Sequence, residues 1–289
     1  MQAVGWLLCC VVICLVRPLT ERERQEAVIE EFWRNTVWGK SVHDVLLLGD
    51  SRTYFGLSPE ILETYRPGWS VYNFGFSSGR INRQLLMEAS KRLKPDGKRI
   101  FVFACTPIDL MNVHNEDFFV KKRQIFSFSF IFSKKTFFQA FSFREIEASY
   151  DFTSGFAAMH RTKEPIACQF TFDDYTRNFT GRPFSPSDFA AFVDDLRWCR
   201  EQKIHVIAFR MVSCPEMDDL EDRLSHCDFN KIRQAVLDAG FTWLERPPAP
   251  MLQAIGDQCY DASHLNESGA TSLSHWLGQQ LKTLKLPQR

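Results

Sequence analysis

Two short groups of polar residues, at opposite ends of the chain, have the types and spacing needed for nucleophilic chemistry. Gly49-Asp50-Ser51 follows the apolar run Val45–Leu48 and precedes a helix-like stretch, which predicts Ser51 at a strand-to-helix turn. Such a turn exposes the hydroxyl at the edge of a sheet, and the helix N-terminus favours a developing negative charge. Asp261 and His264 lie three positions apart near the other end. Asp261 could hold the imidazole while His264 takes the proton of Ser51.

The composition of the chain is that of a globular protein and excludes one class of partner. Its 289 residues suffice for one large domain or two small ones, and 45% hydrophobic residues can fill a sizeable core. Lys plus Arg total 35 and Asp plus Glu total 35, so the formal net charge is zero. A nucleic-acid-binding domain needs a basic excess or stripe, and we therefore expect no nucleic-acid partner.

The nine cysteines include no C-x-x-C pair. Cys214 and Cys227 flank an acidic, loop-like stretch and could pair if the compartment is oxidising. Within that stretch, the run Asp218–Asp222 is predicted to be a solvated helix end. Cys214, His226 and Cys227 are metal-ligating types, but their spacing matches no zinc site, so we expect no metal.

The N-terminal segment, residues 1–18, is the part predicted to meet a membrane. Ala3–Val16 is apolar and ends at Arg17-Pro18, and it is shorter than the roughly 20 residues that span a bilayer. It is read as an uncleaved membrane anchor, a signal sequence or a buried N-terminal helix. Residues 19–40 are charged and helix-prone, as in a stalk. We expect a membrane-anchored protein whose main domain is periplasmic or otherwise extracytoplasmic.

From residue 41 onward, apolar β-prone runs alternate with helix-like segments. The five runs are Val42–Leu48, Ser70–Phe74, Arg99–Thr106, His205–Met211 and Phe241–Leu244. The main helix-like segments are Leu57–Tyr65, Asn82–Leu93, Pro186–Gln202, Asn230–Ala239 and Glu267–Leu284. This alternation predicts an α/β three-layer sandwich with a parallel five-stranded sheet of the flavodoxin-like kind. Sites in such folds lie beyond the carboxyl ends of the strands, where Ser51 and Thr106 are placed.

A phenylalanine-rich insertion at about residues 111–185 interrupts the alternation. Phe126–Phe132 alternates with serine as a strand does, whereas Lys134–Phe143 has the pattern of an amphipathic helix. The sequence leaves this secondary structure open. The insertion is either a satellite core under a long connection, or a lid, an acceptor groove or a membrane-facing surface.

Taken together, these motifs resemble those of SGNH/GDSL hydrolases. The resemblance rests on Gly49-Asp50-Ser51-Arg52, on Asn73-Phe74-Gly75 through Gly79-Arg80, and on Asp261-x-x-His264. With the N-terminal segment included, the chain is most similar to a bacterial membrane-anchored subgroup. Relatives of that subgroup act in O-acylation of envelope polysaccharides and teichoic acids, commonly beside a membrane-bound O-acyltransferase. The resemblance implies an SGNH-like domain over residues 41–286 and no metal or organic cofactor.

The resemblance also implies a role for each matched residue. Ser51 would be the nucleophile, His264 the general base and acid, and Asp261 the residue that orients His264. The backbone N–H of Ser51 would donate to the oxyanion. A second N–H would come from Gly79, with Gly75 as the alternative.

The chain departs from the family in its third block, where an asparagine side chain usually supplies a further oxyanion donor. Residues 104–109 read Ala-Cys-Thr-Pro-Ile-Asp at that place. Losing one oxyanion donor typically costs about 10²–10³-fold in rate. Either Thr106 or a residue of the insertion substitutes, or the site works slowly, or it is not catalytic.

The sequence therefore predicts an SGNH-type serine esterase or O-acyltransferase that works through an acyl-enzyme on Ser51. Its expected substrates are acyl esters, above all acetyl esters, of an envelope carbohydrate. The expected partners are an acyl ester donor, a carbohydrate acceptor, the membrane and a membrane-bound O-acyltransferase. One alternative is a catalytically inactive SGNH module that binds polysaccharide or an acyltransferase membrane partner. Another is a plain secreted esterase or lipase with a lipid-facing phenylalanine lid.

Overall fold

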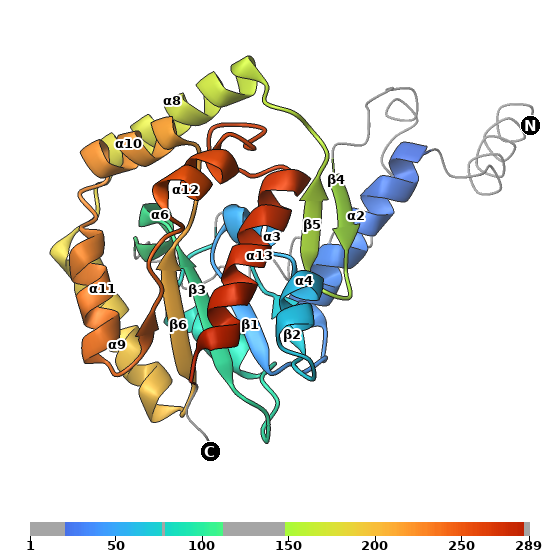
Figure 1. Ribbon diagram of the computed structural model, residues 1–289, viewed down its shortest axis with the longest axis vertical. Helices are drawn as coiled ribbons and strands as arrows, with labels where there is room; N and C mark the ends of the chain where they lie inside the picture. Colours follow the sequence, from blue (N-terminus) through green and yellow to red (C-terminus); the bar gives the residue numbers. More distant parts are fainter. Residues whose placement is uncertain (1–20, 77–78, 112–147, 286–289) are drawn as a thin grey trace, which may run out of the picture.

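A parallel five-stranded sheet forms the centre of the computed structural model, which describes residues 21–76, 79–111 and 148–285 (Figure 1). The strands are β1 (Val45–Leu48), β2 (Val71–Asn73), β3 (Ile100–Cys105), β6 (His205–Arg210) and β7 (Thr242–Trp243). Their order across the sheet is β2-β1-β3-β6-β7, and every neighbouring pair is parallel. This is the flavodoxin-like order, so the predicted α/β fold class is confirmed. Each strand lies inside one of the predicted apolar runs.

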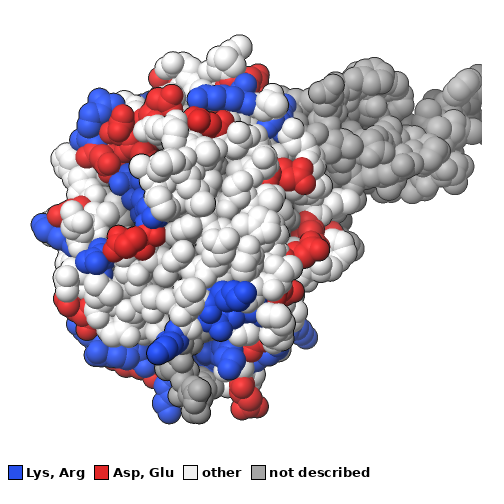
Figure 2. All heavy atoms as spheres, viewed as in Figure 1, with Lys and Arg blue, Asp and Glu red and all other residues white. Residues whose placement is uncertain are grey.

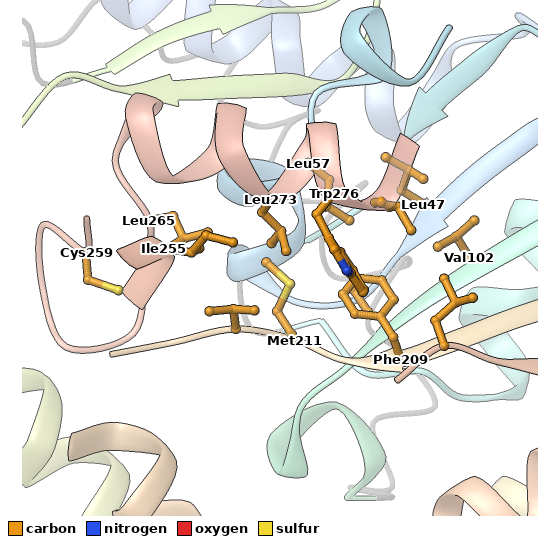
Figure 3. Close-up of a cluster of buried hydrophobic side chains, with 14 of the residues drawn as sticks. Leu47, Leu57, Val102, Phe209, Met211, Ile255, Cys259, Leu265, Leu273 and Trp276 are labelled. Atoms are coloured by element: carbon orange, nitrogen blue, oxygen red, sulfur yellow. The ribbon is translucent and has the colours of Figure 1, made fainter. Parts of the chain in front are cut away.

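Helices cover both faces of the sheet, so β1, β2 and β3 are buried along their whole length. One face packs mainly against α4 (Pro59–Tyr65), α8 (Pro165–Gly181), α10 (Pro215–Leu224), α12 (Ala249–Gly256) and α13 (Glu267–Thr283). The other packs against α5 (Arg83–Ser90), α9 (Pro186–Glu201) and α11 (Phe229–Asp238). Figure 3 shows the first core, where Trp276 of α13 meets Phe209 of β6 with their ring centroids 5.5 Å apart. Burial of such residues is the main force that holds the layers together.

The five helix-like segments named from the sequence correspond to α4, α5, α9, α11 and α13. At the start of α13, the side chain of Asn266 accepts a hydrogen bond from the N–H of Gly269 at 3.1 Å. This is the N-cap that the sequence predicts. It fixes the point where the loop carrying Asp261 and His264 turns into the last helix.

Helix α2 (Glu21–Trp38) lies over the edge of the domain, and its last turns are packed against it. Phe32 and Thr36 are fully buried. The Arg92 guanidinium donates to the carbonyls of Asn35 and Thr36 at 2.8 and 2.7 Å, which satisfies the end of the helix. The second half of the predicted stalk therefore forms part of the core. The predicted anchor, residues 1–18, lies outside the described residues, and no helix among those described has the length and apolarity to span a bilayer.

The described part of the insertion forms an antiparallel hairpin, β4 (Ala148–Asp151) and β5 (Phe156–Met159), followed by α8. The hairpin packs on α2 and on α3 (Ser51–Gly56) through a small apolar cluster built on Phe32, Tyr54, Phe55, Ala157 and Met159. The stretches Phe126–Phe132 and Lys134–Phe143 lie outside the described residues.

The structure differs from the sequence interpretation of residues 214–227 in two respects. The stretch that looked loop-like is helix α10, and its inner face buries Glu221 to 1% exposure instead of leaving it solvated. Cys214 and Cys227 are both free and buried, so they do not pair.

On the surface, charged side chains of both signs are interspersed around a largely uncharged area over α13 (Figure 2).

Candidate active site

Ser51 is the first residue of α3, directly after β1 and the turn formed by Gly49 and Asp50. Asp50 is the N-cap of this helix, and its Oδ1 accepts a hydrogen bond from the N–H of Arg52 at 2.8 Å. A Cβ atom at Gly49 would lie 2.2 Å from Thr53 Oγ1, so the tight approach requires glycine. The structure thus places Ser51 at the strand-to-helix turn that the sequence predicts.

Asp261 and His264 lie in the loop between α12 and α13, and this loop brings the imidazole to Ser51. The Nε2 atom of His264 is 2.7 Å from Ser51 Oγ. The Nδ1 atom of His264 is 2.8 Å from Asp261 Oδ2 and 3.1 Å from Asp261 Oδ1. The three side chains therefore form one continuous hydrogen-bonded chain that runs from hydroxyl to carboxylate.

Backbone groups of the same loop hold the Asp261 carboxylate. Its Oδ1 accepts from the N–H of Ser263 at 2.7 Å and from the N–H of His264 at 2.8 Å. Burial acts to raise the pKa of Asp261, but the nearby His264 and these hydrogen bonds outweigh it and leave the pKa below its ordinary value. The carboxylate is thus ionised at neutral pH and can stabilise a protonated imidazole.

Two aromatic rings and a hydroxyl, to which the sequence assigned no role in the site, also contact the imidazole of His264. Tyr260 stacks on it with ring centroids 5.6 Å apart and an interplanar angle of 21°. Phe55 meets it edge-on at 5.7 Å and 83°. The Ser263 hydroxyl lies 2.9 Å from Nδ1. Together with Asp261, these groups fix the plane and the tilt of the ring.

The N–H groups of Gly79 and Gly75, the two expected second oxyanion donors, both make hydrogen bonds in the structure. The N–H of Gly79 donates to the carbonyl of Phe76 at 2.8 Å, and the N–H of Gly75 donates to Asn73 Oδ1 at 3.0 Å. Both donors are therefore already committed. Within the part of the chain that the structure describes, the N–H of Ser51 has no acceptor and remains available.

The glycines of the second block serve close packing instead. A Cβ atom at Gly75 would lie 2.7 Å from the backbone nitrogen of Tyr54, and one at Gly79 would lie 2.9 Å from the carbonyl oxygen of Gly49. Real Cβ contacts are almost never this short. The two glycines let the second block lie directly against the turn that carries Ser51.

Thr106, the third oxyanion candidate, is 1% exposed and directs its hydroxyl toward carboxylates. Its Oγ1 lies 3.1 Å from Asp50 Oδ2 and 2.8 Å from Asp109 Oδ2. Because both contacts are to acidic groups, the single hydroxyl proton is not free to stabilise an oxyanion. Thr106 therefore does not replace the absent asparagine in this geometry.

Arg52, next to Ser51, anchors the nucleophile turn from beneath. Its Nη2 donates to Glu221 Oε1 at 2.6 Å, and both side chains are 1% exposed. Its guanidinium also lies over the ring of Tyr175, 5.1 Å from the centroid. Burial acts to lower the pKa of Arg52, while Glu221 raises it well above its ordinary value, so the group stays charged. The contacts tie the turn to α10 and α8.

Among residues 21–76, 79–111 and 148–285, no group of three or more His, Cys, Asp or Glu side chains converges as the ligands of a metal ion would.

Comparison with known proteins leaves the family unassigned. No family model and no curated protein matches the chain. Among solved structures, it is similar to a protein from Streptococcus pneumonia that is provisionally described as a platelet activating factor. The identity is 13%, the match covers 97% of this chain and 98% of the other, and the TM-score is 0.38.

The chain is also similar to a catalytic mutant of an acetylxylan esterase from Geobacillus stearothermophilus. The identity is 10%, the match covers 86% of this chain and 97% of the other, and the TM-score is 0.43. With identities and TM-scores this low, neither similarity indicates which reaction this chain catalyses. Its function has to be argued from its own side chains.

Proposed function

We propose that this chain is a serine esterase or O-acyltransferase of the SGNH type, with Ser51, His264 and Asp261 as its catalytic triad. The observation that carries the proposal is the hydrogen-bonded chain from Ser51 Oγ to His264 Nε2, at 2.7 Å, and from His264 Nδ1 to Asp261 Oδ2, at 2.8 Å. A hydroxyl in contact with a base that a carboxylate orients is the arrangement that activates serine. Its place beyond the carboxyl ends of the strands is where such sheets bind ligands.

In the proposed reaction, Ser51 Oγ attacks the ester carbonyl carbon while His264 Nε2 takes the hydroxyl proton. The N–H of Ser51 donates to the oxyanion that forms. The bond to the leaving alcohol then breaks, and the alcohol departs with the proton from Nε2, leaving the acyl group on Oγ. Water or a carbohydrate hydroxyl then attacks the acyl carbon and gives its proton to Nε2. The bond from the acyl carbon to Oγ breaks, Oγ takes the proton from Nε2, and the carboxylic acid or the new ester leaves. Asp261 stabilises the imidazolium without becoming protonated itself.

The substrate class and the location are part of the same proposal. We propose that the acyl group is acetyl and that its carrier or acceptor is an envelope carbohydrate, because the motifs resemble those of the envelope O-acylation subgroup. The apolar segment Ala3–Val16 supports attachment to a membrane. The domain would then work on the extracytoplasmic side, beside a membrane-bound O-acyltransferase.

The test is the hydrolysis of p-nitrophenyl acetate by the full chain, by Ser51→Ala and by the control Ser272→Ala. Ser272 lies on α13, where its hydroxyl donates to the Ser268 carbonyl at 3.0 Å on the exposed side. We expect a burst of p-nitrophenol and an acetylated Ser51 peptide from the parent and from Ser272→Ala. Ser51→Ala should give neither. Equal turnover by all three proteins would contradict the proposal.

A second candidate function follows from the oxyanion geometry. The N–H groups of Gly79 and Gly75 and the hydroxyl of Thr106 already face acceptors. A catalytically inactive SGNH module that binds polysaccharide or a membrane acyltransferase would tolerate this arrangement. Saturable polysaccharide binding that Ser51→Ala leaves unchanged, without any ester hydrolysis, would favour the second candidate over the first.

A further inference from the structure

We propose that Asp109 is a positioning residue that stays protonated at neutral pH. It donates a hydrogen bond to Thr106, which in turn donates to an ionised Asp50, so that one buried proton holds the turn carrying Ser51. The protonation of Asp109 stands on its own geometry. Only its consequence for turnover rests on the proposed function.

The three side chains meet in the interior, beneath the carboxyl edge of the sheet. Asp50 follows β1, Thr106 follows β3, and Asp109 lies in the short helix α6 (Pro107–Leu110). Their exposures are 2%, 1% and 0%. Thr106 Oγ1 lies 3.1 Å from Asp50 Oδ2 and 2.8 Å from Asp109 Oδ2, and it also accepts the N–H of Asp109 at 3.1 Å.

A count of protons shows that two ionised carboxylates do not fit these contacts. A threonine hydroxyl carries a single proton, so it can donate to Asp50 or to Asp109 but not to both. With both acids ionised, one carboxylate oxygen would face the lone pairs of Thr106 Oγ1, and two buried negative charges would oppose each other across one hydroxyl. One added proton resolves both conflicts, because one acid then donates to Oγ1 while Oγ1 donates to the other acid.

The surroundings decide which acid holds this proton. Both oxygens of Asp50 have donors, since Oδ1 accepts the N–H of Arg52 at 2.8 Å and Oδ2 faces the hydroxyl of Thr106. Asp50 is also the N-cap of α3. In Asp109, Oδ2 accepts the N–H of Thr106 at 3.1 Å and faces the Thr106 hydroxyl, but Oδ1 is buried and has no hydrogen-bond partner among the described residues. Asp109 is therefore the acid that keeps the proton.

The charges around Asp109 agree with this assignment. The titratable groups that face it are Asp50, Arg52, Arg80 and Cys105. Burial and the charge of Asp50 raise the pKa of Asp109 well above its ordinary value. The contact with the Thr106 side chain and the guanidinium groups of Arg80 and Arg52 oppose this only in part. The Arg52 guanidinium is instead paired with Glu221 at 2.6 Å.

The position of Asp109 explains why this proton would matter to Ser51. The Asp109 carbonyl accepts the N–H of Ile81 at 2.9 Å, so the residue also holds the chain that follows the second block. Loss of the proton would place a second negative charge behind the Ser51 turn and would remove one of the hydrogen bonds that define it. Turnover should therefore decline on the alkaline side as Asp109 ionises.

The direct test is infrared spectroscopy of the full chain and of Asp109→Asn, with Asp261→Asn as the matched control. Spectra are taken at about pH 8, because burial raises the pKa of another acid, Asp195, to about 6. We expect a protonated-carboxyl C=O band in the parent and in Asp261→Asn, and its loss in Asp109→Asn. Absence of a band that depends on Asp109 would overturn the proposal. This readout needs no activity, so it is independent of the proposed function.

A second measurement uses only the parent chain, so it can be made even if Asp109→Asn does not fold. In the parent labelled with carbon-13 at aspartate side-chain carboxyls, one resonance should keep its protonated position through neutral pH. Full ionisation of every aspartate at that pH would overturn the proposal.

Turnover supplies a further readout if the chain is active. The side-chain amide that Asp109→Asn introduces can still donate a hydrogen bond but does not titrate. This variant should therefore show no decline of ester turnover at alkaline pH, and it should turn over ester at least about tenfold faster than Asp109→Ala. Equal losses in the two folded variants, with the alkaline decline retained, would contradict a role for the proton.

Discussion

The hydroxyl oxygen of Ser51 lies 2.7 Å from the Nε2 atom of His264, although 213 positions separate these residues in the chain. The fold closes this distance because β1 delivers Ser51 to one edge of the sheet and the loop before α13 returns to that edge. A hydrogen bond from the N–H of Ser58 to Ser274 Oγ, at 2.8 Å, ties α13 to the segment after Ser51. The contact between serine and histidine therefore depends on how the last helix packs.

Asp261→Asn should lower the turnover number of ester hydrolysis by about 10²–10⁴-fold, because an amide favours the wrong imidazole tautomer and cannot stabilise the imidazolium. The pKa of Asp261 is below its ordinary value in the folded chain. The parent therefore gains stability from this acid above its unfolded pKa of about 3.9, and loses it as the pH falls through the lower folded value. In urea unfolding, the free energy of unfolding of Asp261→Asn should lack this decrease at acidic pH. Unchanged turnover would point to Ser263 as a sufficient orienting group.

Gly75→Ala should impair both stability and turnover, because the added Cβ would lie 2.7 Å from the Tyr54 nitrogen and must push the nucleophile turn away. Gly181→Ala is the matched control, since a Cβ atom there meets nothing within 4 Å. Urea unfolding should show a loss of about 1–3 kcal/mol for the first variant and little change for the second. Equal behaviour of the two variants would argue against close packing of the second block on Ser51.

Glu221→Gln should destabilise the chain by about 3–5 kcal/mol, because it leaves the buried charge of Arg52 without its partner. Asp222→Asn, on the same helix, removes a carboxylate that is 58% exposed and 2.8 Å from Arg210. That control should cost less than about 1 kcal/mol. Denaturant midpoints of the two variants check the contrast, and a small loss for Glu221→Gln would mean that Arg52 finds another partner.

His43 should make the fold sensitive to mild acid. Burial, with help from Arg92 and Lys94, lowers the pKa of His43 from 6.5 to about 4. Because the folded pKa lies below the unfolded one, the stabilising contribution is complete above about pH 6.5 and is lost as the pH falls toward 4. The free energy of unfolding measured across this range should fall in the parent and fall less in His43→Gln. Parallel curves would assign the acid sensitivity to other groups.

The sheet was predictable because its central strands β1 and β3 are apolar along their whole length, as is typical of parallel strands buried on both faces. All six residues of β3 are buried, and the prediction for this strand was only one residue too long at each end. The hairpin of the insertion was not predictable in this way. Its strand β4 alternates between half-buried and exposed residues and is only four residues long.

The site was predictable in part. Residue types and motif spacing identified Ser51, Asp261 and His264 as residues that could meet. The edge contact of Phe55 with His264 depends on tertiary packing. The bond from the N–H of Gly79 to the carbonyl of Phe76 is a local turn bond, which the residue types alone do not report. Likewise, Glu221 is buried because it meets a residue 169 positions away, and no local pattern reports such a partner.

The most direct test of the account is intact-mass analysis of the full chain after treatment with a fluorophosphonate, alongside Ser51→Ala and Ser272→Ala. The reagent bonds covalently to a serine that a neighbouring base has activated. We expect one adduct on the parent and on Ser272→Ala, and none on Ser51→Ala. An adduct on folded Ser51→Ala, or no adduct on the folded parent, would contradict the assignment of Ser51 as an activated nucleophile.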